Sequence, residues 1–184
     1  MMSSTLGSAG NRPSAAAGSW KRVGTIRSGG TMNRSAGGAS GIRSPAGLRM
    51  PEAPPADLFI VPPERIVPTL FHDPAAAEGL FPAEPSVDDI MRIYRNNTAF
   101  ARYAWRPFLN DPKLERRLYR ITSPTLVVWP DDDKVIPRAH AERYVERIAD
   151  ARLEVIEDCG HALYGEKPQE ITDTVLAFAN GGSR

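Results

Sequence analysis

The chain has 184 residues, 41% of them hydrophobic, and a formal net charge of +1 at pH 7, so it has room for one domain and no charge excess that favours nucleic acid. Its one cysteine excludes an internal disulfide bond, and no apolar run approaches the roughly 20 residues of a transmembrane helix or forms a signal-peptide core. We therefore expect a cytoplasmic protein without a nucleic-acid or membrane partner.

Residues 1–43 are rich in Ser, Gly, Ala and Arg and show neither helical nor strand periodicity. Residues 1–51 carry seven Lys or Arg and no Asp or Glu, which leaves 16 basic and 22 acidic residues in the rest. Because such a segment cannot bury enough apolar surface to offset its ordering entropy, we expect a disordered basic tail. It could be a transit peptide, a disordered arm or sequence read out of frame, and the last is the interpretation we favour.

Between residues 44 and 120 the sequence predicts helices separated by proline-rich stretches. Ser86 stands three residues before Asp89, a variant of the capping box, and opens a helix whose apolar residues recur on one face. These residues are Val87, Ile90, Met91, Tyr94, Ala101 and Trp105. A second helix is expected after Asp111 and Pro112.

Residues 125–161 predict a β-α-β unit. Residues 125–129, Thr-Leu-Val-Val-Trp, are apolar and partly β-branched, which is typical of a strand buried on both faces. Residues 138–149 place their apolar side chains on one stripe and predict an amphipathic helix, and residues 152–156 predict a second strand. The two strands should be parallel, with a right-handed crossover. Residues 164–178 predict a final helix that covers the sheet.

A polar cluster follows each of the two strands. Asp131, Asp132 and Asp133 follow the first, and His161 follows the second. Ligands of an open parallel sheet gather outside the carboxyl ends of its strands, so we expect these side chains at the same edge. The aspartates could instead cap the next helix, and His161 could be a surface residue, but the pairing favours function. Cys159 is interpreted as a partly buried thiol.

The order strand, acidic loop, Val-Ile-Pro, helix, strand, Gly-His and Pro-started helix resembles the C-terminal part of an α/β-hydrolase. The resemblance covers residues 44–179 loosely and residues 121–179 well. It implies an α/β fold class and a partial α/β-hydrolase fold, with the last parallel strands, their helices and a helical cap. It also implies that Asp133, four residues before Pro137, is the acid of a catalytic triad and that His161 is its general base.

The same resemblance divides the chain into a tail, residues 1–43, and the C-terminal portion of a hydrolase domain, residues 44–184. Within this portion it implies a cap at about 63–120 and a β-α-β-α core at about 121–180. Four aromatic residues of the cap would line a substrate pocket or simply pack between helices: Phe100, Tyr103, Trp105 and Phe108.

The family hydrolyses a small ester, amide or related bond, which implies a small-molecule substrate and neither cofactor nor metal. However, its nucleophile turn, Gly-x-Ser-x-Gly, occurs nowhere in the sequence, so we expect the chain as written to be inactive. A non-catalytic remnant or interaction module is one alternative. Another is a metal-dependent sugar transferase that uses the cluster of three aspartates. No pattern indicates the oligomeric state.

Overall fold

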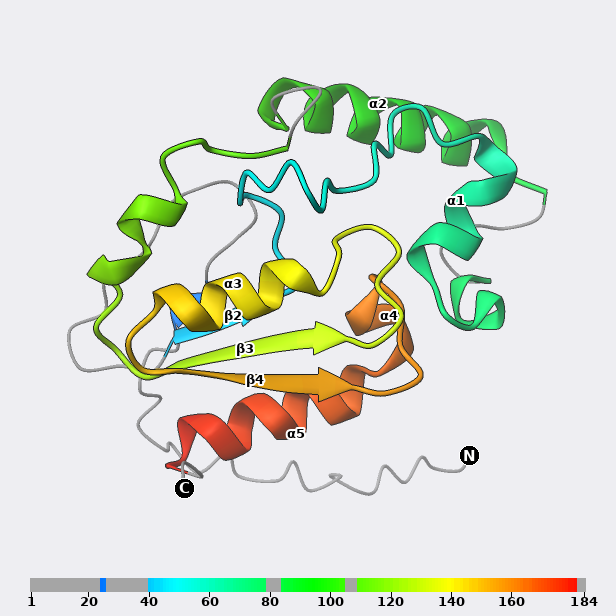
Figure 1. Cartoon of the computed structure of the whole chain (residues 1–184). Helices are drawn as coiled ribbons and strands as arrows, with labels where there is room; N and C mark the ends of the chain where they lie inside the picture. Colours follow the sequence, from blue (N-terminus) through cyan, green and yellow to red (C-terminus); the bar gives the residue numbers. More distant parts are fainter. Residues whose placement is uncertain (1–23, 26–39, 79–83, 105–108, 182–184) are drawn as a thin grey trace, which may run out of the picture.

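The structure is a computed structural model that describes residues 24–25, 40–78, 84–104 and 109–181. Its centre is a parallel sheet of four strands in the order β1-β2-β3-β4. The strands are β1 (Gly24–Thr25), β2 (Ser40–Arg43), β3 (Thr125–Pro130) and β4 (Ala151–Ile156). Helices α3 (Ala139–Arg147) and α5 (Pro168–Ala179) cover opposite faces of the sheet, as Figure 1 shows. The expected α/β fold class, with a parallel sheet between helices, is confirmed.

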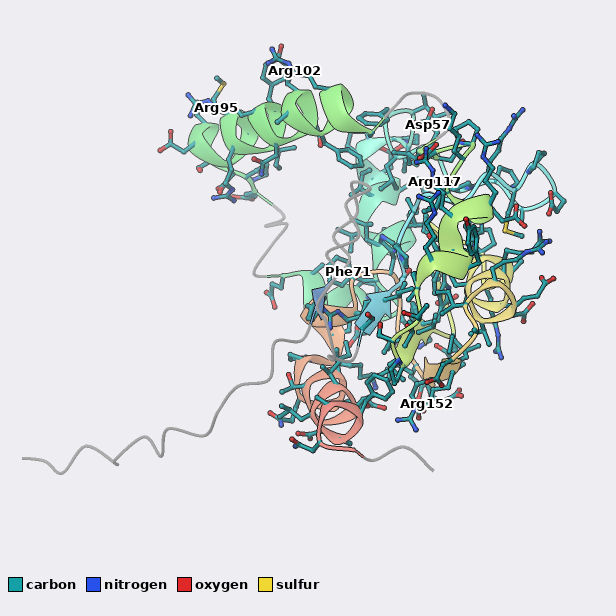
Figure 2. The ribbon with its side chains drawn as sticks, turned by 90° about the vertical axis from the view of Figure 1, so that its left-hand side faces the viewer. Asp57, Phe71, Arg95, Arg102, Arg117 and Arg152 are labelled. Atoms are coloured by element: carbon teal, nitrogen blue, oxygen red, sulfur yellow. The ribbon has the colours of Figure 1, made fainter. Side chains whose placement is uncertain are left out.

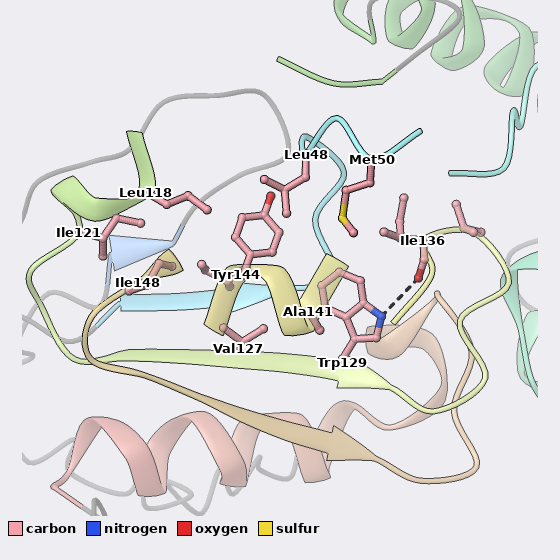
Figure 3. Close-up of a cluster of buried hydrophobic side chains, with 12 residues drawn as sticks. Leu48, Met50, Leu118, Ile121, Val127, Trp129, Ile136, Ala141, Tyr144 and Ile148 are labelled. Carbon is pink, nitrogen blue, oxygen red and sulfur yellow. Dashed lines mark hydrogen bonds between the residues drawn. The ribbon is translucent and has the colours of Figure 1, made fainter. Parts of the chain in front are cut away.

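All six residues of β3 are buried, because the strand has a neighbour on each side and a helix on each face. Val127 and Trp129 belong to the hydrophobic cluster under α3 (Figure 3), whereas Leu126 and Val128 belong to the cluster under α5. Successive side chains of a strand point to opposite faces, so this short apolar run fills both cores. The Trp129 indole N–H donates to the carbonyl of Ile136, 3.3 Å away.

The predicted β-α-β unit is present. Strands β3 and β4 pair in parallel with Thr125 opposite Ala151, and α3 connects them. Ala141, Tyr144 and Ile148, which the helical spacing places on one stripe, are buried against this sheet. Because the crossover brings both strands to the same direction, the loops after β3 and β4 emerge at one edge of the sheet (Figure 1).

Strand β2 corrects the expected boundary at residue 44. The sequence places residues 40–43 in a disordered tail, yet they pair with β3 in parallel, Ser40 opposite Thr125 and Arg43 opposite Val128. Ile42 is the single large apolar residue in this segment, so no alternation of apolar and polar residues indicates a strand. The pairing is set by the neighbouring strand rather than by local sequence. Apart from residues 24–25 and 40–43, the predicted tail lies outside the described residues.

The region between β2 and β3 contains helices α1 (Pro63–Leu70) and α2 (Val87–Tyr103) and the 3₁₀ helices η1 (Pro74–Ala77) and η2 (Glu115–Arg120). A short helix, α4 (Leu163–Glu166), precedes α5. The α2 capping box forms as predicted: the Ser86 hydroxyl accepts from the Asp89 N–H, and the Asp89 carboxylate accepts from the Ser86 N–H. The helix expected after Asp111 is the 3₁₀ helix η2 instead.

Helix α2 projects away from the rest of the molecule, which Figure 2 shows at the labelled residues Arg95 and Arg102. Its contact with the described remainder includes a stacked pair of rings, Phe59 and Phe100, whose centroids lie 5.2 Å apart. Phe100 therefore packs against the loop that carries Phe59, and its role in lining a pocket stays a prediction. Trp105 and Phe108 lie outside the described residues, as does the side chain of Tyr103. No helix among the described residues is long and apolar enough to cross a membrane.

Candidate active site

Asp133 and His161 lie together where the loops after β3 and β4 meet. The Nδ1 atom of His161 is 3.0 Å from Oδ2 and 3.1 Å from Oδ1 of Asp133. A carboxylate only accepts hydrogen bonds, so the ring nitrogen that faces it carries the proton. The Asp133 side chain is 2% exposed and that of His161 is 26% exposed. The acid is thus sealed inside the domain while the histidine reaches the surface.

Two backbone amides hold the Asp133 carboxylate in place. Its Oδ1 accepts from the N–H groups of Val135 at 2.9 Å and Ile136 at 2.8 Å, so the side chain closes the turn that its own loop makes. It does not cap α3, which begins after Arg138 without a side-chain cap. Asp133 therefore has two roles: it stabilises its own turn and it pairs with His161.

Ser44 is a further member of the site that the sequence analysis did not identify. It follows β2 directly, is 6% exposed, and has φ of +34°, a left-handed backbone conformation that is uncommon outside glycine. Its hydroxyl donates to Oδ2 of Asp133 and lies 3.2 Å from Nδ1 of His161. Because Nδ1 already faces the carboxylate, Ser44 sits on the acid side of the imidazole. This position makes it a support for Asp133.

The three consecutive aspartates point to three different partners. Asp131 accepts from the backbone N–H groups of Asp158 and Cys159, both at 3.1 Å, and so joins the ends of β3 and β4. Burial raises the pKa of Asp131, but these N–H groups more than offset it and hold the pKa below its ordinary value. Asp133 is the member of the trio that faces His161, which is the register that the family resemblance implied.

Asp132 forms a small polar cluster with Lys134 and His72, next to the acid of the pair. Its Oδ2 lies 2.9 Å from the Lys134 ammonium and 3.0 Å from Nδ1 of His72. The hydrogen bond from Lys134, assisted by that from His72, lowers the pKa of Asp132. The segment that follows α1 thus brings His72 to the loop that also carries Asp133.

The second ring nitrogen of His161, Nε2, has no hydrogen-bond partner among the described residues. A nucleophile that His161 activates would have to approach this atom. Cys159 does not serve, because it is fully buried and burial raises the pKa of its thiol to about 12. The expectation of a partly buried thiol therefore underestimates the burial, which is complete.

His140 is a structural histidine. It is fully buried on α3, and its Nε2 donates to the carbonyl of Ala53 at 2.7 Å. Burial lowers the pKa of its imidazole, which keeps the ring neutral. Among the described residues no group of three or more His, Cys, Asp or Glu side chains could hold a metal ion. The three aspartates that suggested a metal-dependent transferase diverge, so they do not form the expected acidic cluster.

The sequence matches the model of a protein family over most of its length. The model described as "Alpha/beta hydrolase family" matches residues 10–174. Among curated proteins, a 2-hydroxy-6-oxo-6-phenylhexa-2,4-dienoate hydrolase of Comamonas testosteroni is 37% identical over 75 residues, 41% of this chain and 26% of that protein. The human monoacylglycerol lipase ABHD6 is 28% identical over 65 residues, 35% of this chain and 19% of the lipase. These alignments span about a quarter or less of the relatives' length.

Solved structures of hydrolases share the fold of this chain, as expected for a partial α/β-hydrolase fold. A serine hydrolase of Cycloclasticus zankles superposes with a TM-score of 0.57 at 19% identity, and the match covers 78% of this chain and 56% of that one. The meta-cleavage product hydrolase of Pseudomonas fluorescens IP01 also gives a TM-score of 0.57, at 17% identity, covering 79% of this chain and 57% of that one. The chain thus spans little more than half of these structures.

Proposed function

Because this chain belongs to the alpha/beta hydrolase family, we propose that Asp133 and His161 are the acid and the base of a hydrolytic site for a small-molecule substrate. The observation that carries the proposal is the distance of 3.0 Å between Nδ1 of His161 and the buried carboxylate of Asp133. The two residues come in the chain order that the family uses for acid and base.

The proposed chemistry follows from this geometry. Asp133 holds the proton of neutral His161 on Nδ1, which leaves Nε2 as an acceptor at the surface. This nitrogen would take a proton from an attacking hydroxyl and later return it to the leaving group, while Asp133 stabilises the imidazolium in between. Ser44 and the two amides at residues 135 and 136 fix the carboxylate, so the imidazole keeps one orientation.

The substrate class is proposed from the relatives. Those above are named for the hydrolysis of a dienoate and of monoacylglycerols. We infer a small ester or a related carbonyl compound as the substrate of the complete site. Segment 63–120 would supply the cap over it, which is supported by the contact of His72 with Asp132, the residue before Asp133.

We further propose that the polypeptide as written does not complete this reaction. The full sequence contains no Gly-x-Ser-x-Gly turn, and in this fold that turn presents the nucleophile and one oxyanion donor. An acid and a base without a nucleophile have nothing to activate. The alternative of a non-catalytic remnant or interaction module remains, and it is favoured by the apolar residues Val87, Ile90 and Tyr94, which are more than half exposed on α2.

Turnover of a chromogenic short-chain ester and labelling by a fluorophosphonate test the proposal together. The expected result is no label and no turnover above that of the same chain in denaturant, which controls for the intrinsic reactivity of imidazole. Turnover abolished by His161→Ala but retained by Glu170→Ala, a matched surface variant, would support the acid–base pair and contradict inactivity. Turnover that survives His161→Ala would overturn the assignment of His161 as the base.

A further inference from the structure

One carboxylate, that of Glu166, binds three backbone N–H groups from two separate segments. Its Oε1 accepts from His72 and Asp73, both at 2.8 Å, and its Oε2 accepts from Gly160 at 2.7 Å. Hydrogen bonds to an ionised acceptor are roughly twice as strong as neutral ones. Glu166 therefore joins the segment that follows α1 to the residue immediately before His161.

The same two segments are in direct contact at Gly160. A Cβ atom on this residue would lie 2.5 Å from the backbone nitrogen of His72 and 2.8 Å from the carbonyl oxygen of Leu70. On the other side of His161, the Ala162 N–H donates to that Leu70 carbonyl at 2.8 Å. Both chain neighbours of His161 are thus fastened to residues 70–72, and only glycine fits before it.

This segment also contacts the loop of the acid. His72 reaches Asp132, which directly precedes Asp133, with a distance of 3.0 Å between Nδ1 and Oδ2. Phe71, labelled in Figure 2, is 2% exposed and anchors the segment, whereas no residue of α1 itself is buried. Residues 70–73 therefore touch the base loop through Glu166 and the acid loop through His72.

We propose that Glu166 is a positioning residue that fastens residues 70–73 across the two loops and so sets the distance between Asp133 and His161. Displacement of the segment after α1 would then move the imidazole relative to its acid. The inference rests on the proposed function only in treating His161 as a base; the mechanical link is independent of turnover.

The test measures the link directly and requires no catalysis. In Glu166→Ala, amide hydrogen exchange at His72, Asp73 and Gly160 should accelerate about tenfold or more, because each amide loses its acceptor. The ¹⁵N resonances of the His161 ring should shift as well, while amides of β3 keep their protection. Glu166→Gln retains one acceptor oxygen and should give an intermediate result. Glu170→Ala, an exposed acid in the first turn of α5, is the matched control and should change none of these signals.

Gly160→Ala provides a second route, since its methyl group separates the same segments without touching the carboxylate. It should reproduce the shift of the His161 ring resonances. Faster exchange at the three amides with unchanged ring resonances would show that Glu166 only stabilises the fold and would overturn the proposal. Equal changes in Glu170→Ala would overturn it too. Failure of the ester assay would leave these outcomes unaffected.

Discussion

Helices α3 and α2 are both amphipathic, but the structure uses them differently. The apolar stripe of α3 is buried, with Tyr144 and Ile148 packed against β3 (Figure 3), whereas Val87 and Tyr94 of α2 are 76% and 66% exposed. A periodic sequence pattern therefore indicates that a helix forms and which side is apolar, but it does not say what that side contacts. The well-packed part of the described chain is the unit around β3, and α2 is an arm attached to it.

The largest contrast is expected between aromatic residues of the two regions. Trp129→Ala removes a fully buried indole and its bond to Ile136, and should lower the free energy of unfolding by about 3–5 kcal/mol. Tyr94→Ala, on the exposed face of α2, should change it by less than about 0.5 kcal/mol. Urea denaturation followed by circular dichroism measures both. Equal losses would show that α2 packs as firmly as β3.

The Cys159 thiol reports on the hydrophobic cluster under α5, on the other face of β3. Its pKa rises from 9.0 to about 12 because of burial, so the thiolate fraction near pH 8 falls about a thousandfold. Alkylation by iodoacetamide should therefore be much slower in the native chain than in denaturant, because few thiolates form and the side chain is buried. Rapid native labelling would mean that the loop after β4 opens readily, which would contradict close packing of Cys159 in its cluster.

Two serines allow the unit around β3 and helix α2 to be compared by the same type of substitution, serine to alanine. Ser44→Ala removes the hydroxyl that donates to the buried Asp133 carboxylate and should cost about 1–3 kcal/mol of global stability. Ser86→Ala removes the N-cap of α2, an effect of about 1 kcal/mol on that helix. Because α2 is only loosely attached, this loss should appear as faster amide exchange within α2 and leave the urea midpoint unchanged. A lower urea midpoint in Ser86→Ala would contradict the separation of the two regions.

Acid should weaken the junction of β3 and β4. The folded pKa of Asp131 lies below its ordinary value of 3.8, so its contribution to stability is complete above that value and is lost as the pH falls through the folded pKa. Asp131→Asn should flatten the pH dependence of the unfolding midpoint below about pH 4. An unchanged profile would mean that the bonds to residues 158 and 159 are unimportant.

The unit around β3 was predictable because its signals are local. The apolar run of residues 125–129 and the helical spacing of residues 138–149 each define an element within a few turns of chain, and the order of acid and histidine then suggests their meeting. Strand β2 was missed because its structure comes from pairing with β3, across about 80 intervening residues. Its sequence alone, with Ile42 as the single large apolar residue, favours a loop.

The parts of the site that sequence reasoning missed are all long-range contacts. Ser44 is separated from Asp133 by 89 positions, and the bond between His72 and Glu166 spans 94. A serine after an unremarkable segment and a glutamate near a helix end carry no spacing signal that relates them to the pair. Asp133 and His161 could be named because each directly follows a strand of a recognisable unit.

Nitrogen NMR of the His161 ring tests the central claim most directly, namely that Asp133 fixes this imidazole with its proton on Nδ1. The chain has three histidines, so His161→Ala assigns the signal. We predict that neutral His161 shows a protonated Nδ1 and an unprotonated Nε2, and that Asp133→Asn abolishes this preference, while Asp132→Asn leaves it intact. A neutral ring with its proton mainly on Nε2, or a tautomer that is unchanged in Asp133→Asn, would contradict the account.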